Sequence, residues 1–347
     1  LMVSAAILML VALWWWASGL EKKDAGRGTR MSQNRPVPDG SKTPAPPEPL
    51  AFPGERCRPW WASGAIQKPK KPIDALFLTS SVLDPYGLVA AGFASDCGEQ
   101  RVFAAESATA GMVAAAAGKK SVVVAYGPAA VELALEAVPD MPLVYAGVAN
   151  PEGRGLDSVN MAGVSRWLPA VAIARHWHEV LPKGPIALFR LPGAPEDFAG
   201  RLEKALAGLG RKVVPAAIGN GGQLGNVLAS LPADVAAWAL VCHRSLLEDE
   251  LFGRLQAEAD RRRVPLAVTD ERHARAGALV GAGTDSHRVG EQLCRLAEAM
   301  RSHKLPEGSH LFCPEYSFAV VNLTRAEKLG YMIDFDKVRQ VKVYKWH

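Results

Sequence analysis

The feature that most constrains this chain is a regular alternation of short apolar runs with segments long enough for a helix. The alternation starts at Ile73 and ends near residue 270. Strands that alternate with helices of about 10 to 15 residues form parallel sheets, because a parallel strand pair needs a crossover connection. The sequence therefore predicts an α/β fold. The expected strands are 73–79, 101–105, 121–125, 141–148, 186–189, 212–216, 236–241 and 265–268.

The expected strands fall into two blocks, separated by a predicted helix at 169–181. A chain of 347 residues is long enough for two domains. We therefore expect two doubly wound, Rossmann-like lobes, each with its own parallel sheet. Ligands bind beyond the carboxyl ends of the strands in such sheets. Two lobes whose strand ends face each other would share a cleft, and a hinge would close it around a ligand.

The N-terminal part of the sequence differs from the rest. Residues 2–16 (MVSAAILMLVALWWW) carry no charge, but this run is shorter than the roughly 20 residues that span a bilayer as a helix. Small residues follow at 17–19, where a signal peptidase cleaves. Residues 1–20 are therefore predicted to be an export signal, with an uncleaved membrane anchor as the alternative. The basic residues near the run follow it instead of preceding it, which is unusual for either.

Residues 21–72 are rich in proline and lack periodic apolar residues. A segment of this composition cannot bury enough surface to offset its chain entropy, so we expect an extended tether.

The charge of the whole chain limits which partners it can bind. Its net charge is +5, and no block of Lys and Arg is dense enough for a nucleic-acid-binding arm. We therefore expect no nucleic-acid partner.

The five cysteines are widely scattered, and none has the spacing of a zinc site. In an exported chain their odd number leaves at least one thiol unpaired. Cys242 and Cys294 are expected to be buried as small apolar side chains. The sequence also lacks the phosphate-binding motif GxxxxGK[ST], the nucleophile motif GxSxG and the zinc motif HExxH. We therefore predict no enzyme activity, no cofactor and no metal site.

The best-motivated binding element is the start of the helix that follows the strand at 121–125. Tyr126 ends that strand, and Gly127 and Pro128 open the helix. Proline suits the first helical position because its φ angle is preset and it has no N–H to lose. The free N–H groups of a first turn carry partial positive charge and can receive a carboxylate. A plain helix start without a ligand is the alternative.

Other candidates lie where the remaining expected strands end. Ser80 and Ser81 follow the first strand and either bond a ligand or cap the next helix. Asn150 either points toward a ligand or holds a turn. In the second block a carboxylate is expected to pair with a ligand ammonium, and an arginine with a ligand carboxylate, unless these charges are merely solvated. The candidates in that block are His243, Arg244, Asp270 and Glu271.

Four segments resemble a known family when they are taken together and in order. They are 125–156, which contains AYGPAAVELALEAVPDMPLVYAGVANPEGRGL, and the three segments 163–165, 276–300 and 318–333. The chain resembles ABC transporter substrate-binding proteins of the tryptophan- and tyrosine-binding kind, which have the type I periplasmic-binding-protein fold. That fold implies three crossings between the lobes, here near Ser165, Ala282 and Gly308. The implied N-terminal lobe is 73–165 plus 283–308, and the C-terminal lobe is 166–282 plus 309–347.

The resemblance implies a function as well. It implies capture of a small, amino-acid-like solute in the interlobe cleft and its delivery to an ABC permease. The protein is then expected in the periplasm or elsewhere outside the cytoplasm, either free or anchored to the membrane by its N-terminal segment. A ligand-sensing module of a signalling system is the alternative on the same fold. This chain departs from the family at 190–193 (RLPG) and at His243 and Arg244, which leaves two ligand classes open, an aromatic amino acid and a more acidic ligand. The basic, aromatic tail at 337–347 either contacts a membrane or partner or forms a final strand.

Overall fold

The computed structural model describes most of the chain from residue 66 onward. The described residues are Cys57, 66–81, 83, 85–118, 120–148, 151, 154–156, 158–190, 196–219, 221–241, 250–306, 308 and 310–345. The predicted export signal and most of the predicted tether therefore lie outside them. Within the described ranges, no helix is both long and apolar enough to cross a bilayer.

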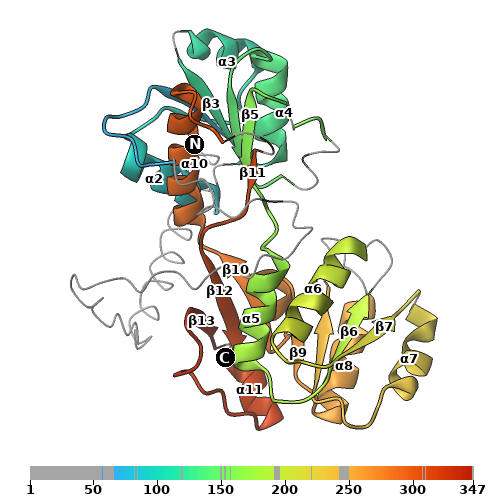
Figure 1. The fold of residues 1–347 in the computed structure, drawn as a ribbon. Coiled ribbons are helices and arrows are strands. Elements are labelled where there is room, and N and C mark those ends of the chain that lie inside the picture. Colours follow the sequence, from blue (N-terminus) through green and yellow to red (C-terminus); the bar gives the residue numbers. More distant parts are fainter. Residues whose placement is uncertain are drawn as a thin grey trace, which may run out of the picture. The chain divides into compact units, whose positions relative to one another are not determined.

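The first lobe is built on a six-stranded sheet in which every neighbouring pair is parallel (Figure 1). Its strand order is β11-β5-β4-β3-β1-β2. This confirms the parallel α/β arrangement predicted from the alternating runs. The strands are β1 (Ala75–Thr79), β2 (Val102–Ala104), β3 (Val122–Tyr126), β4 (Leu143–Ala146), β5 (Met161–Val164) and β11 (Leu311–Phe312).

Both faces of the first sheet are covered by helices, which explains why its strands are apolar throughout instead of alternating. Successive side chains of a strand point to opposite faces. Phe77 of β1 packs in the cluster with α2 (Tyr86–Cys97) and α10 (Ser286–Arg301). Leu76 and Leu78 pack in the cluster on the other face, with α3 (Ala110–Ala117) and α4 (Pro128–Ala137).

The helices α2 and α10 contact each other through glycines. A Cβ on Gly92 would lie 1.9 Å from the carbonyl oxygen of His287, and a Cβ on Gly290 would lie 2.1 Å from that of Val89. Neither position therefore admits a side chain without a backbone shift. A disulfide between Cys97 and Cys294 joins the same two helices, and both cysteines are fully buried.

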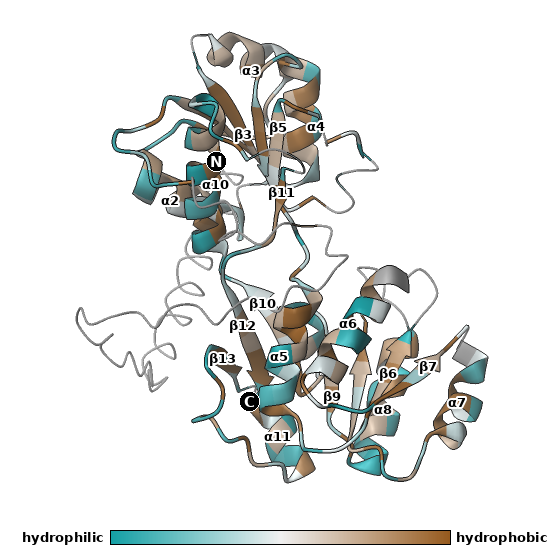
Figure 2. Cartoon of the chain, in the orientation of Figure 1, coloured by the Kyte–Doolittle hydropathy of each residue, from teal (hydrophilic) through white to brown (hydrophobic). Residues whose placement is uncertain are grey.

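The second lobe is built on a seven-stranded sheet with the order β13-β12-β10-β9-β8-β6-β7. One face carries α5 (Ala170–Val180) and α6 (Glu196–Gly208), and the other carries α7 (Leu224–Ser230), α8 (Glu250–Arg262) and α9 (Glu271–Arg275). Figure 2 shows hydrophobic residues along β3 and β12, inside their respective sheets. The strands are β6 (Ile186–Arg190), β7 (Val213–Ala217), β8 (Ala237–Leu240), β9 (Leu266–Val268), β10 (Val280–Thr284), β12 (Ser317–Asn322) and β13 (Val341–Tyr344).

Two strands of the second sheet, β10 and β12, were not among the expected strands, and β12 runs antiparallel to β10. The chain passes from one sheet to the other after β5, after β10 and after β11. Leu311 and Phe312, which the implied boundary at 308 assigned to the second lobe, pair with Gly163 and Val164 of the first sheet. The strand alternative for the tail is observed, since Val341–Tyr344 forms β13 beside β12.

A second disulfide joins Cys57 to Cys313, which lies directly after β11. Cys294 is buried, as expected, but it is half of a disulfide and not an isolated small apolar side chain. Sequence reasoning missed both bonds because connectivity cannot be deduced from five scattered cysteines. Cys242 lies outside the described residues.

Candidate functional site

The carboxyl end of β3 holds the best-defined candidate site. Gly127 caps the start of α4 with a φ of 96°, and Pro128 occupies the first helical turn. The Gly127 N–H donates to the carbonyl of Ala146 on the neighbouring strand β4, at 2.9 Å. A Cβ at this glycine would lie 2.4 Å from the Ser80 hydroxyl oxygen. Glycine is therefore required here by both its backbone angle and the close approach of Ser80.

Ser80 caps α4 from the adjacent strand β1. Its hydroxyl oxygen accepts from the Ala130 N–H at 3.2 Å, and its own N–H donates to the Tyr126 carbonyl at 3.0 Å. This differs from the expected cap of the helix that follows Ser80 in the sequence. The Ala129 N–H has no partner among the described residues, and the Ser80 hydroxyl proton remains available to donate.

Two tyrosine rings lie beside this helix start. The rings of Tyr86 and Tyr126 meet edge to face, with centroids 5.4 Å apart and planes at 68°. Burial raises the pKa of Tyr126 above its usual value; Tyr86 raises it further and Arg166 opposes the rise. The Tyr126 hydroxyl therefore keeps its proton at neutral pH and can act as a donor. Sequence reasoning missed Tyr86 because nothing in its local sequence marks it as a partner of β3.

Five of the predicted residues lie at the carboxyl edge of the first sheet, and they are Ser80, Ser81, Tyr126, Gly127 and Pro128. Ser80, Tyr126, Gly127 and Pro128 contact one another through the helix start just described. Ser81 follows β1, and its hydroxyl accepts from the Leu83 N–H at 3.3 Å, which is a local turn. Chemically, this edge offers hydrogen-bond donors to a carboxylate and aromatic surface to an apolar group.

The predicted carboxylates of the second lobe already have partners inside the protein. Asp270 caps α9 and accepts from both the backbone N–H of His273, at 2.9 Å, and its Nδ1, at 2.7 Å. Burial alone would raise the Asp270 pKa, but the contacts with His273 outweigh it and lower the pKa. Glu271 bonds Arg275, and it accepts from the Tyr344 hydroxyl at 2.7 Å. A ligand ammonium would have to compete with these contacts.

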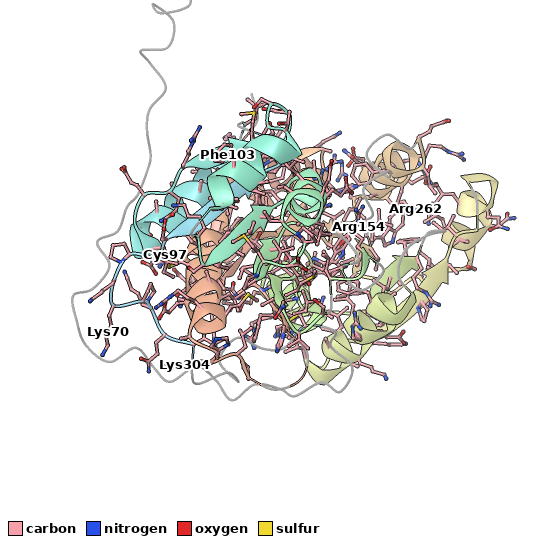
Figure 3. All side chains as sticks on the ribbon, turned by 90° about the horizontal axis from the view of Figure 1, so that it is seen from above. Lys70, Cys97, Phe103, Arg154, Arg262 and Lys304 are labelled. Atoms are coloured by element: carbon pink, nitrogen blue, oxygen red, sulfur yellow. A yellow bond between two sulfur atoms is a disulfide. The ribbon has the colours of Figure 1, made fainter. Side chains whose placement is uncertain are left out.

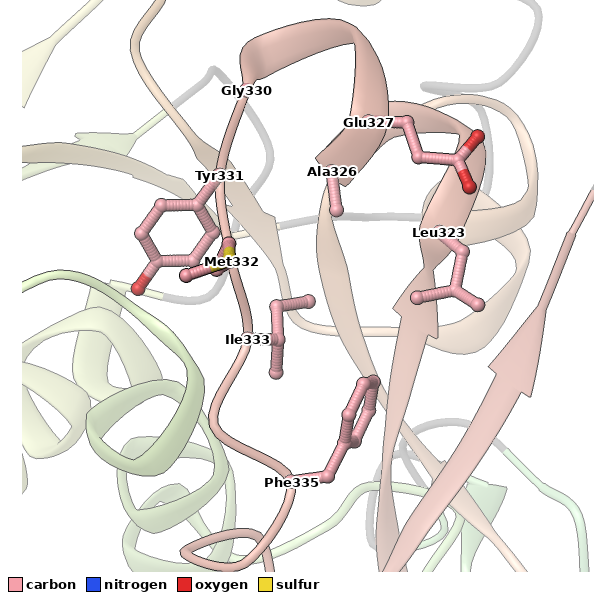
Figure 4. A pocket seen from close by; sticks show the side chains of 8 residues that line it. All are labelled: Leu323, Ala326, Glu327, Gly330, Tyr331, Met332, Ile333 and Phe335. Carbon is pink, nitrogen blue, oxygen red and sulfur yellow. The ribbon is translucent and has the colours of Figure 1, made fainter.

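Three predicted residues, Asn150, His243 and Arg244, lie outside the described residues, so their role stays a prediction. Among the residues that are described, no group of three or more His, Cys, Asp or Glu is placed to hold a metal ion. A cavity of about 280 Å³ lies between α11 (Leu323–Leu329) and the segment after it, with Tyr331, Ile333 and Phe335 in its wall (Figure 4). None of the predicted ligand residues lines it.

Comparison with known proteins rests on structure alone, since no protein-family model and no curated protein sequence matches the chain. One solved structure that matches is the ligand-free, open form of a substrate-binding protein with adhesive properties from Clostridium difficile. The match has a TM-score of 0.61 at 16% identity and covers 79% of this chain and 100% of that one. This chain has the type I periplasmic-binding-protein fold. The fold expected from the sequence is thereby confirmed.

Two other solved structures match less closely. One is an ABC domain in complex with L-Trp from Streptococcus pneumonia, with a TM-score of 0.48, 16% identity and coverage of 77% of this chain and 100% of that one. The other is a conserved domain protein from Vibrio cholerae, with a TM-score of 0.48, 19% identity and coverage of 78% and 100%.

Proposed function

We propose that this chain is an exported solute-binding protein of an ABC importer, which captures a small carboxylate-bearing, amino-acid-like molecule between its lobes and delivers it to a permease. The observation that carries the proposal is the helix start at the carboxyl edge of the first sheet. There Gly127 and Pro128 open α4, and the Ala129 N–H, the Ser80 hydroxyl and the Tyr126 hydroxyl are available as donors. In open α/β sheets this edge is where ligands bind.

In the proposed complex the ligand carboxylate accepts hydrogen bonds from these donors, and the partial positive charge of the α4 N-terminus supports them. The ring edges of Tyr86 and Tyr126 contact the apolar part of the ligand. The second lobe then closes over the ligand. Closure requires that the ligand bind the closed form more tightly than the open form, since a ligand shifts an equilibrium only by its differential affinity.

Export is supported by the two disulfides, Cys57–Cys313 and Cys97–Cys294. Disulfides persist in oxidising compartments and are rare in the cytosol. Because both cysteines are buried, the test unfolds protein from the cell envelope before alkylation, and Cys97 and Cys294 should then resist alkylation unless the protein is first reduced. Free, alkylatable thiols at both positions in envelope protein would remove this support for export.

Ligand binding is tested by thermal unfolding of the full chain against the natural amino acids and related carboxylates. A ligand present at 100 times its Kd adds about 2.7 kcal/mol to the free energy of unfolding. Tyr126→Phe removes one donor and keeps the ring, so it should weaken binding of the identified ligand by about 10-fold. Tyr331→Phe is the matched control, because the Tyr331 hydroxyl bonds the Val180 carbonyl away from the site.

The amide of the same ligand lacks the carboxylate charge. Its affinity for the wild type should be no higher than the affinity of the acid for Tyr126→Phe. Equal binding of acid and amide, or equal binding by wild type and Tyr126→Phe, would contradict the proposed site. Ser80→Ala is less informative, because it also removes the cap on Ala130 and so lowers stability by about 1 kcal/mol.

A further inference from the structure

A cationic groove lies on the first lobe, and none of the candidate ligand residues lines it. Segment 66–72 and the C-terminal end of α10 enclose a cavity of about 540 Å³. Five cationic side chains line it, and we call them the basic groove: Lys68, Lys70, Lys71, Arg301 and Lys304. Figure 3 shows Lys70 and Lys304 on the same side of the lobe.

Three of the five charges of the basic groove have no ion-pair partner among the described residues. Lys68 pairs with Asp96 at 2.6 Å, and Arg301 pairs with Glu298 at 2.8 Å. No ion pair between described residues involves Lys70, Lys71 or Lys304, and all three side chains are exposed. The groove therefore carries an excess of three positive charges on a small surface.

The helix dipole of α10 explains only part of this clustering of positive charges. Cations near the C-terminus of α10 interact favourably with the helix dipole, which accounts for Arg301 and Lys304. Lys70 and Lys71 come from a different segment, which the fold holds against the lobe. Ile66 and Ile73, at either end of that segment, are buried in the same core as α10. The two lysines are thus fixed beside the existing charges, although like charges repel.

The position of the basic groove indicates what compensates the repulsion. Segment 66–72 is where the predicted tether 21–72 joins the first lobe, and the apolar run 2–16 precedes that tether in the sequence. The charges are exposed lysines and not buried donors, so they suit an extended anionic surface better than one small enclosed anion. A membrane surface is such a partner, and with the uncleaved-anchor alternative for residues 1–20 the tether would hold the lobe within reach of it.

We propose that the basic groove binds the anionic headgroups of a lipid bilayer. This goes beyond solute binding and does not depend on it. Each lysine close to an anionic bilayer favours binding by about fivefold, and the attraction fades beyond the Debye length of about 10 Å. The three unpaired lysines together should favour anionic over neutral membranes by about 100-fold.

The experiment measures binding of the full chain to phosphatidylcholine vesicles with and without phosphatidylglycerol. Wild type is compared with the triple variant Lys70→Gln, Lys71→Gln and Lys304→Gln. The matched control replaces three exposed second-lobe lysines that likewise have no ion pair between described residues: Lys183→Gln, Lys204→Gln and Lys212→Gln. The N-terminal segment is common to all three proteins, so the ratio of anionic to neutral binding isolates the substituted charges.

We expect the groove variant to lose most of the 100-fold preference and the control variant to keep it. All three proteins should unfold at similar temperatures, because neither variant breaks an ion pair between described residues. Equal loss in both variants would mean that only net charge matters and would overturn the proposal. So would a wild type without preference for anionic vesicles, or one displaced from them by inorganic phosphate at constant ionic strength, which would indicate a site for a soluble anion.

Discussion

Acid should destabilise the second lobe through one buried histidine on α5. Only 5% of His176 is exposed, and its Nε2 lies 3.0 Å from the Ser317 hydroxyl. Its Nδ1 is buried without a partner among the described residues. Burial disfavours the charged imidazolium and Arg175 repels it, so the pKa of His176 falls from 6.5 to about 4. The folded protein therefore holds this ring in its neutral form.

The sign and size of the effect follow from linkage. Between pH 6.5 and about 4 the unfolded chain takes up a proton at His176 that the folded protein excludes. The free energy of unfolding therefore keeps its full value with respect to His176 above pH 6.5, and it decreases as the pH falls from 6.5 to about 4. At 1.36 kcal/mol for each unit of pKa difference, the whole loss is about 3 kcal/mol. At pH 5 it amounts to about 2 kcal/mol.

The assay is guanidinium denaturation at pH 7 and pH 5, followed by the fluorescence of Trp177 and Trp238, which are buried in the second lobe. Other groups titrate in this range, so wild type is compared with His176→Gln, which cannot titrate but keeps a polar side chain. Between the two pH values wild type should lose about 2 kcal/mol more than the variant, with unchanged denaturant dependence. Equal losses in the two proteins would refute the reasoning.

Two further predictions concern the first lobe. Gly127→Ala should lower the free energy of unfolding by about 2 kcal/mol in a thermal melt, because of its φ of 96° and the contact with Ser80. Gly111→Ala in α3 should not lower the free energy of unfolding, because nothing lies within 4 Å of the new Cβ. Equal losses of stability in the two variants would contradict this account. Replacing Cys97 and Cys294 by alanine should cost about 2–5 kcal/mol in denaturant titrations, since their bond closes a 197-residue span. A variant as stable as oxidised wild type would count against that estimate.

The sequence predicted the fold well where local apolar pattern decides the structure. The runs at 73–79, 121–125 and 186–189 became β1, β3 and β6, because strands covered on both faces are apolar along their whole length. The direction of β12 has no such signal, since its apolar run suits a parallel or an antiparallel strand equally. Its antiparallel pairing with β10 follows from the route of the chain through β11, and β11 is only two residues long.

The candidate site was predicted only in its local part. The Gly-Pro pair marked the start of α4, since proline at a first turn and glycine before it have backbone reasons that a sequence shows. The contact between Ser80 and Ala130 joins residues 50 apart, and that between Glu271 and Tyr344 joins residues 73 apart. Such contacts depend on which strands become neighbours. That order is set by the packing of the whole sheet and not by any local pattern.

The third crossing between the sheets limits how the proposed closure can occur. Gln292 of α10 donates to the Cys313 carbonyl at 2.8 Å and accepts from the Glu315 N–H at 3.1 Å, so the chain stays fixed to the first lobe through Glu315. Ser317 already begins β12 of the second sheet. Hinges absorb motion in the dihedral angles of a few residues. Because only Tyr316 lies between the two fixed points, closure has to be accommodated largely at that residue and at the other two crossings.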